Sequence, residues 1–175
     1  MENLRIEGDK IYLRKLEPGD VNGNYPNWFE DPEVCKYNNH EPGTKTKQDF
    51  INYINSVYNN KNEYVFAICD KKDDTHIGNI SIQRIDHKNK NAEIAIVLGE
   101  RSYWGKGVGK EAWKLTMEFG FNQIGLHRLY CGTHVENVGM QKLALACGME
   151  KEGIQKDAMF KNGKYVDVIL YGATK

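Results

Sequence analysis

The sequence predicts a mixed α/β domain in which helices flank a mostly antiparallel sheet. Three observations predict this fold class: segments that alternate apolar and polar residues, segments with an apolar face at helical spacing, and turn signals between successive strands. The chain has 175 residues, of which 40% are hydrophobic and 27% are charged. A chain of this length and composition fits a single domain over residues 1–175 with an ordinary core.

The first third of the chain predicts one strand followed by helices. Residues 9–16 alternate as a strand with one buried face. Pro18-Gly19-Asp20 is a turn and helix-start signal, and Asp31-Pro32-Glu33 places a capping carboxylate before a proline at the first helical position. A longer helix is expected to begin near Thr46.

The rest of the chain predicts a three-stranded meander, a helix, a strand, a helix and a final hairpin. The helix after the meander has Val108, Ala112 and Phe119 on one face, and the next helix, 137–147, is closed by Gly148. Asn162-Gly163 is a strong hairpin signal. The strands are expected at residues 64–69, 76–85, 92–98, 128–134, 149–160 and 164–171.

Charge and cysteine usage exclude several classes of protein. The 24 basic and 24 acidic residues cancel, so we expect no nucleic-acid partner and no membrane-surface binding. There is no run of about 18 apolar residues, and Met1 to Arg5 lack the apolar stretch of a signal peptide, which predicts a cytoplasmic protein. The four cysteines are widely spaced and no His-x-x-x-His pair occurs, so no metal site is expected.

The most informative segment is the glycine loop, which we define as Trp104 to Lys110. Three glycines at alternate positions join a predicted strand to a predicted helix. Glycine lets the backbone approach a ligand closely, and free amides at a helix start bind anionic oxygens. A phosphate or pyrophosphate is the natural ligand, while a tight turn that needs glycine only for its geometry is the alternative.

Two common phosphate loops do not match this segment. A Walker loop needs a glycine where Trp104 stands and a Ser or Thr where Glu111 follows Lys110. A dinucleotide loop needs Gly-x-Gly-x-x-Gly within a βαβ unit, but this loop reads Gly-x-Gly-x-Gly after an antiparallel meander.

Taken together, the motifs resemble the GCN5-related N-acetyltransferases, in the branch that includes ribosomal-protein and amino-sugar acetyltransferases. The resemblance runs over essentially the whole chain. It implies an acetyl-CoA-dependent N-acetyltransferase whose sheet splays open to admit the cosubstrate. The motifs that carry it are Ile11-Tyr12-Leu13-Arg14, Trp28-Phe29-Glu30-Asp31-Pro32-Glu33-Val34, Trp104-Gly105-Lys106-Gly107-Val108-Gly109-Lys110-Glu111-Ala112, His127-Arg128-Leu129-Tyr130, Glu136-Asn137, Cys147-Gly148-Met149 and Asp167-Val168-Ile169-Leu170-Tyr171.

The resemblance also assigns cofactor contacts. The amides of the glycine loop would hold the CoA pyrophosphate, the strand at 92–98 would pair with the pantetheine arm, and an amide near Val97-Leu98 would hold the thioester carbonyl. Such an amide also stabilises the oxyanion. Asn137 is either a cofactor contact or a helix cap. The implied set is Ile96, Val97, Leu98, Trp104, Gly105, Lys106, Gly107, Val108, Gly109, Lys110 and Asn137.

Proton transfer needs a base for the amine and an acid for the leaving thiolate. Glu93 is the first candidate base, because it lies on the strand that by the resemblance carries the acetyl group. Strand alternation would place it beside Ala95 and Val97, which would partly desolvate it; the alternative is an exposed or salt-bridged carboxylate. The family's usual acids, a tyrosine or a serine, fall on Ala144 and Met140. Either water takes over that role, or one of three other side chains does, namely Tyr130, His134 or Cys147.

The acceptor pocket is expected between residues 20–46 and the last hairpin. Trp28, Tyr37, Asn39 and His40 supply aromatic faces and polar groups there, although Trp28 also fits a core position. The expected acceptor is a small-molecule amine or a protein N-terminus, with a nucleotide-linked amino sugar slightly ahead. Polyamines rank third because the sequence shows no clustered acids.

Two further points stay open at this stage. Without its usual thiolate acid, the chain also fits a catalytically silent CoA-binding regulatory module. No cysteine lies in an activated motif, so direct transfer in a ternary complex is favoured over an acetyl-cysteine intermediate. The sequence leaves the oligomeric state undecided, with a homodimer as one option.

Overall fold

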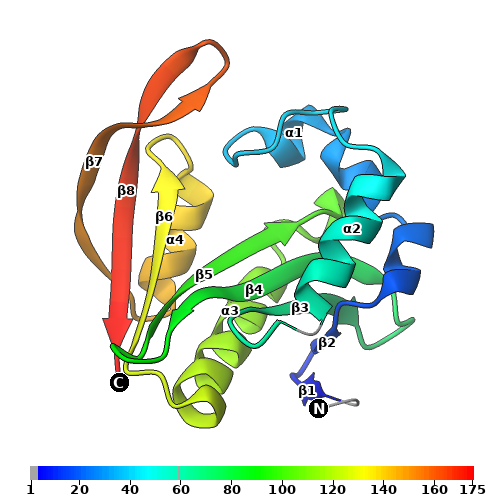
Figure 1. Ribbon diagram of the computed structural model, residues 1–175, viewed down its shortest axis with the longest axis horizontal. Coiled ribbons are helices and arrows are strands. Elements are labelled where there is room, and N and C mark those ends of the chain that lie inside the picture. Colours follow the sequence, from blue (N-terminus) through cyan, green and yellow to red (C-terminus); the bar gives the residue numbers. More distant parts are fainter. Residues whose placement is uncertain (1–3, 59) are drawn as a thin grey trace.

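The computed structural model describes residues 4–58 and 60–175, so the first three residues of the segment Met1 to Arg5 lie outside it. The described residues form an eight-stranded sheet with the order β1-β2-β3-β4-β5-β6-β8-β7. All neighbours are antiparallel except β5 and β6 (Figure 1). The strands are β1 (Arg5–Glu7), β2 (Ile11–Lys15), β3 (Tyr64–Asp70), β4 (His76–Asp86), β5 (Asn91–Leu98), β6 (Arg128–His134), β7 (Glu150–Lys161) and β8 (Lys164–Thr174).

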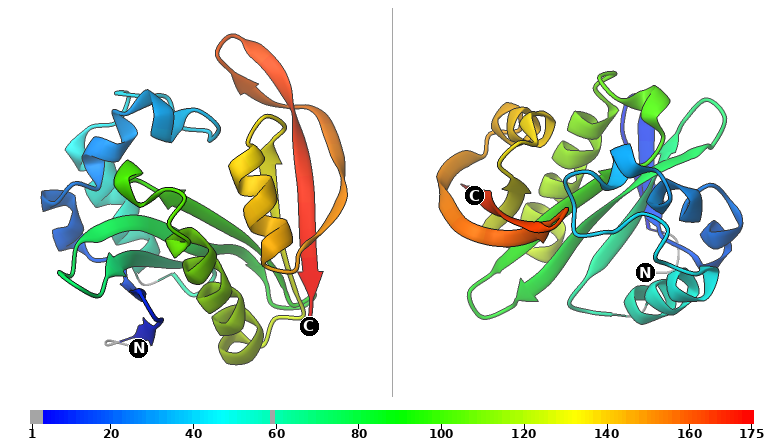
Figure 2. Two further views of the ribbon diagram at one scale, coloured as in Figure 1. Left: turned by 180° about the vertical axis from the view of Figure 1, so that it is seen from behind. Right: turned by 90° about the horizontal axis from the view of Figure 1, so that it is seen from above.

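Helices cover both faces of this sheet. Helices α3 and α4 lie on one face, and the helices that precede β3 lie on the other (Figure 2). The fold therefore confirms the predicted mixed α/β class, while the short strand β1 was not predicted. The helices are η1 (Pro18–Asn22), η2 (Pro26–Phe29), α1 (Pro32–Cys35), α2 (Lys47–Tyr58), η3 (Arg101–Tyr103), α3 (Val108–Glu118), η4 (Phe119–Ile124) and α4 (Val138–Ala146).

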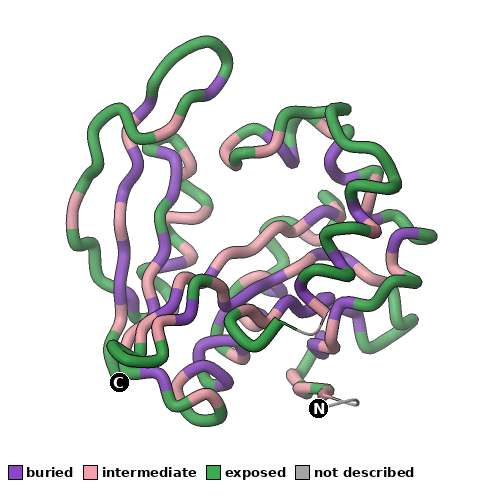
Figure 3. Tube along the Cα trace, in the orientation of Figure 1, coloured by how far each residue is buried: buried purple, intermediate pink, exposed green. Residues whose placement is uncertain are grey.

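Two apolar clusters hold the layers together. The larger one packs Ala112 and Trp113 of α3 against the sheet, and both side chains are fully buried. The smaller one packs Phe50 and Ile54 of α2 against the opposite face. In Figure 3 the buried residues follow the strands and the inner helix faces, whereas the tip of the β7–β8 hairpin is largely exposed. No helix in the described residues has the length and apolar character that a membrane crossing requires.

The sheet separates into two arms between β5 and β6. These strands pair in parallel only from Asn91–Arg128 to Glu93–Tyr130. Beyond that point β5 pairs with β4 up to Leu98, and β6 pairs with β8 up to His134. Each strand thus keeps one neighbour and turns an unpaired edge toward the gap between the arms, which is plain in Figure 1.

Candidate active site

A cleft of about 1160 Å³ lies where the two arms separate. One wall is formed by α1, the segment that follows it, and α2. The other wall includes Gly132 and Thr133 of β6 together with α4, and strands β3 to β5 form the floor. The glycine loop enters the cleft beside the free end of β5. This volume is large enough for a cofactor arm and a small acceptor together.

The end of the glycine loop forms an uncapped start of α3 that lines the cleft. Gly105 and Gly107 have φ angles of +73° and +84°, which other residues adopt only with strain. Gly107 is the N-cap of α3 and has no side chain to accept from the first-turn amides, and no atom of the described residues lies within 4 Å of an added Cβ. The first amides of a helix lack intrahelical acceptors, so this end is open to an anion.

Helix α4 differs, because its own sequence caps it. The side chain of Asn137 accepts a hydrogen bond from the Met140 amide at 3.1 Å. Asn137 therefore acts as the predicted helix cap, and it also lines the cleft.

Side-chain hydrogen bonds fix the position of the glycine loop. The Trp104 indole donates to the Leu98 carbonyl at 2.8 Å. Tyr103 donates to Asp70 at 2.7 Å, a bond that raises the pKa of the tyrosine to about 12. One turn into α3, Glu111 accepts from the Lys10 amide at 2.9 Å. The loop is thereby tied to both β3 and the start of β2.

Most residues of the implied cofactor set lie together along this part of the cleft. Two do not. Val108, the first residue of α3, has its side chain buried in the larger core. The Lys106 side chain lies over the Tyr103 ring at the surface. Neither residue is among the described residues that line the cleft. Those that line the cleft are Ile96, Val97, Leu98, Trp104, Gly105, Gly107, Gly109, Lys110 and Asn137.

Glu93 faces the cleft from β5, and its strand neighbours Ala92 and Ile94 are buried on the opposite face. Its surroundings are more polar than the sequence suggested. Gln83 donates to its carboxylate at 3.1 Å, and Arg84 pairs with it at the same distance. Glu93 is therefore a salt-bridge partner that also lines the cleft, and its role as a base stays a prediction.

The candidate acids lie elsewhere. His134 is buried, its Nδ1 accepts from the Glu136 amide at 3.0 Å, and its ring packs against Tyr37. Neither His134 nor Tyr130 is among the described residues that line the cleft. Cys131 and Thr133 line it instead, but burial raises the pKa of Cys131 to about 12, which makes it a poor proton donor.

Trp28 is a core residue, which corrects its assignment to the acceptor pocket. Its ring is 2% exposed, and its indole donates to Glu100 at 2.8 Å. It packs so closely on Gly99 that an added Cβ would lie 1.9 Å from Trp28 Cδ2. The other three predicted acceptor residues, Tyr37, Asn39 and His40, do line the cleft. Burial lowers the pKa of His40 to about 4, so this imidazole is neutral at pH 7.

Four carboxylates from distant parts of the chain reach the same cleft: Glu33, Asp49, Glu63 and Glu93. Glu33 lies 3.8 Å from Lys36, and Asp49 accepts from the Thr46 amide. Glu63 instead interacts with the Tyr53 hydroxyl, and its burial raises the pKa of its carboxyl. The sequence did not suggest this arrangement, because these acids are separated by 14 to 30 positions and converge only when the sheet forms.

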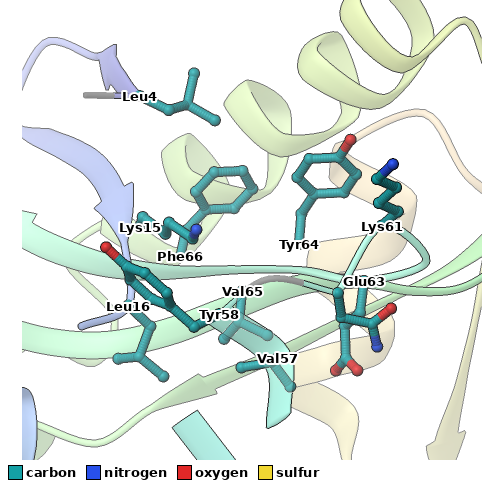
Figure 4. Close-up of a pocket in the computed structure, with 11 residues that line it drawn as sticks. Leu4, Lys15, Leu16, Val57, Tyr58, Lys61, Glu63, Tyr64, Val65 and Phe66 are labelled. Carbon is teal, nitrogen blue, oxygen red and sulfur yellow. The ribbon is translucent and has the colours of Figure 1, made fainter. Parts of the chain in front are cut away.

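A second cavity, of about 360 Å³, lies at the C-terminal end of α2 (Figure 4). Lys15 stacks over the Tyr58 ring there, 3.6 Å from its centroid. Its lining comes from β2, β3 and α2 and includes none of the glycine loop. No group of three or more potential ligand side chains that could hold a metal ion occurs in either cavity or elsewhere among the described residues.

Comparison with known proteins shows the family of this chain. The family model described as "Acetyltransferase (GNAT) domain" matches residues 10–150. A Bacillus licheniformis protein called uncharacterized N-acetyltransferase p20 is 34% identical over 100% of this chain and 97% of its own. The ribosomal-protein-serine acetyltransferase of Escherichia coli K12 is 37% identical over 57% of this chain and 55% of its own.

A solved structure has the same fold. Spermidine N-acetyltransferase from Vibrio cholerae, in complex with CoA and spermine, superposes with a TM-score of 0.87 at 24% sequence identity, covering 95% of this chain and 96% of that one. The chain belongs to the GNAT acetyltransferase family. The protein is an N-acetyltransferase enzyme of this type.

Beyond the predicted residues, the structure adds a link across the cleft entrance. Lys161, at the end of β7, is buried, and its ammonium donates to the His40 carbonyl at 2.6 Å and pairs with Glu41 at 3.2 Å. This contact ties the hairpin arm to the segment after α1, from residues 36 to 46. We expect it to hold that wall of the cleft in place.

Replacing Lys161 with methionine keeps the apolar stem and removes the ammonium. We expect a loss of about 1–3 kcal/mol in the free energy of unfolding, because the partly buried His40 carbonyl loses its charged donor. Amides of residues 38–44 should also exchange hydrogen faster. Denaturant unfolding and hydrogen exchange measure these effects, with the exposed Lys164→Met as control. Equal protection in the two variants would contradict the proposed link.

Proposed function

We propose that the protein transfers the acetyl group of acetyl-CoA to a primary amine that carries positive charge, by direct attack in a ternary complex. The observation that carries this proposal is that the uncapped, glycine-rich start of α3 and four carboxylates open into one cleft. The first feature suits a phosphate-bearing cosubstrate and the second suits a cationic acceptor.

The residues present fit CoA at one end of the cleft. The open amides at the start of α3 would accept the pyrophosphate oxygens, and Lys110 and Lys142 line the same end. The unpaired edge of β5 from Ile96 to Leu98 offers backbone groups to an extended amide-containing arm. When bound, acetyl-CoA supplies an activated carbonyl carbon with a thiolate leaving group.

The transfer balances with one proton released. The acceptor ammonium first loses a proton to a base, and its nitrogen then forms a bond to the carbonyl carbon while the carbon–sulfur bond breaks. The second proton of the nitrogen reaches the thiolate, which leaves as the thiol of CoA. Glu93 is the proposed base. It stands four strand residues from Val97, about 13 Å along β5, so ordered water has to link it to the amine.

The floor of the cleft favours a cationic amine over a nucleotide-linked amino sugar, whose phosphates are anionic. Glu63 and Glu93 lie on this floor, whereas Lys36 and Lys45 belong to the outer segment beside α1. The Vibrio cholerae relative with the same fold is named for spermidine and was solved with spermine. Polyamines therefore move from third to first among the acceptors that the sequence ranked.

An amine panel tests the proposed function. Protein and acetyl-CoA are incubated with spermidine, a diamine, a nucleotide-linked amino sugar and a peptide with a free N-terminus, and free thiol is followed. We expect the highest kcat/KM with the polyamine and diamine. Turnover confined to the sugar or the peptide would overturn the cationic acceptor. CoA binding without turnover on any amine would favour the silent CoA-binding module, a reading that Ala144 and Met140 in the usual acid positions keep open.

Gly107→Ala tests the phosphate site. A left-handed φ costs a non-glycine residue about 1–2 kcal/mol. Gly125→Ala is the control, because Gly125 has a φ of +78° at the end of η4 and is not among the described residues that line the cleft. We expect both alanine variants to lose similar stability. Only Gly107→Ala should weaken CoA binding, by roughly tenfold or more, as measured by calorimetry. Equal CoA affinity in the two variants would count against this loop as the pyrophosphate site.

Glu93→Gln tests the base. The amide keeps the size of the side chain but does not accept a proton, so we expect kcat to fall about 10²-fold while CoA affinity stays the same. Steady-state rates and calorimetry measure the two effects. Glu118→Gln, on the exposed end of α3, is the control. A wild-type kcat would remove Glu93 from this role and leave it as a partner of Arg84.

A further inference from the structure

Strand β4 carries a polar side chain on the cleft face at every second position: Asn79, Ser81 and Gln83. The neighbours of Asn79 on the same face are apolar, namely Ala67 on β3 and Val97 on β5. Packing against these apolar neighbours does not explain why a carboxamide stands at this position. Gln83 is accounted for by its bond to Glu93, but Asn79 lies four residues away from that pair along β4.

One side of the Asn79 carboxamide is fixed by His76. The Nε2 atom of His76 lies 3.0 Å from the Gly78 carbonyl oxygen and 2.7 Å from Asn79 Oδ1. A backbone carbonyl only accepts, so Nε2 must carry the proton and donate. The amide oxygen of Asn79 is then the group that faces His76, and its two N–H donors point away from the histidine.

His76 is itself held by a half-buried charged pair and an aromatic ring. Its Nδ1 lies 3.7 Å from Asp20 Oδ1, and Arg14 donates to both oxygens of Asp20 at 2.6 and 2.9 Å. The edge of the imidazole packs on Trp28, with ring centroids 4.9 Å apart. Three side chains from the first arm therefore fix one ring, which in turn fixes one amide on the cleft floor.

The position of Asn79 matters because of its neighbour. Asn79 stands directly opposite Val97, on the stretch of β5 whose other edge is unpaired and which would hold the thioester carbonyl. Glu93 pairs with Gln83, four residues further along the same ladder. By this register, Asn79 places its N–H donors beside Val97, whereas Glu93 lies four residues away along β5.

We propose that the Asn79 side chain, oriented by His76, donates a hydrogen bond to the acetyl carbonyl oxygen of the bound cosubstrate. This inference rests on the proposed function. The bond strengthens as negative charge develops on that oxygen during attack by the amine, and it adds to the donation from the β5 backbone. Asn79 is then a catalytic residue, and His76 is a positioning residue that acts through it.

The thioester carbonyl stretch provides a readout that does not depend on turnover. Acetyl-CoA labelled with ¹³C at the carbonyl is bound to the protein without acceptor, and its infrared band is compared with that of the free compound. We expect a shift to lower frequency in the wild type and a smaller shift in Asn79→Ala. With an accepted amine, kcat of Asn79→Ala should fall about 10²-fold while CoA affinity and the KM for the amine change little.

Two further variants separate a catalytic role from a structural one. Asn79→Asp keeps the shape but replaces the N–H donors with oxygen, so its rate should fall at least as far as that of the alanine variant. His76→Ala should slow the reaction in the wild type but add nothing in the Asn79→Ala background, and His76→Gln, which retains a donor, should restore part of the rate. Asn52→Ala, on the exposed face of α2, is the control.

The outcomes distinguish this inference from the proposed function. If the wild type binds acetyl-CoA but its carbonyl band does not respond to Asn79→Ala, the inference is wrong and the proposed function stands. If His76→Ala and Asn79→Ala lower the rate additively, His76 does not act through Asn79. If calorimetry detects no binding of acetyl-CoA to the wild type, the proposed function and the inference fail together.

Discussion

The parallel ladder between β5 and β6 stops after three residue pairs, and the rest of the site depends on that short pairing. If it continued, the backbone edge of β5 from Ile96 to Leu98 would be occupied by β6 and the cleft would be closed. The split costs little in hydrogen bonds, because each of the two strands keeps a full antiparallel neighbour on its other side. An extended ligand that lies against β5 would take the place of the missing strand, which is the principle of β-strand addition.

The two helix starts that face the cleft are built differently. Asn137 satisfies the first turn of α4 from within the chain, whereas Gly107 leaves the first turn of α3 without a capping side chain. An uncapped start that was merely exposed would be stabilised by a serine or aspartate. Glycine at this point trades that stabilisation for room in front of the amides, and the hydrogen bonds of Trp104, Tyr103 and Glu111 hold the loop in place.

The proposed acceptor end is assembled from residues that lie far apart in the sequence. The buried ammonium of Lys161 ties the hairpin to His40, and Glu63, Gln83 and Glu93 approach one another only because three adjacent strands bring them to one face. Electrostatic character is consequently a property of the cleft and not of the composition. The lining holds four carboxylates and four lysines, and the fold decides their placement: Glu63 and Glu93 lie at the floor, whereas Lys110 and Lys142 lie on α3 and α4.

The amino-acid sequence by itself determined the order and type of nearly every element, because side-chain periodicity, proline and glycine act locally. It also predicted the glycine loop at the start of α3, since three alternate glycines before an amphipathic helix are a local pattern of ten residues; phosphate binding there stays a prediction. Only the tertiary structure decided that Trp28 is a core residue, that Tyr130 and His134 lie outside the described cleft lining, and that Asn79 faces the cleft with its amide held by His76. Strand register and the angle between the arms decide these matters. Both depend on contacts between residues far apart in the chain, which local patterns do not encode.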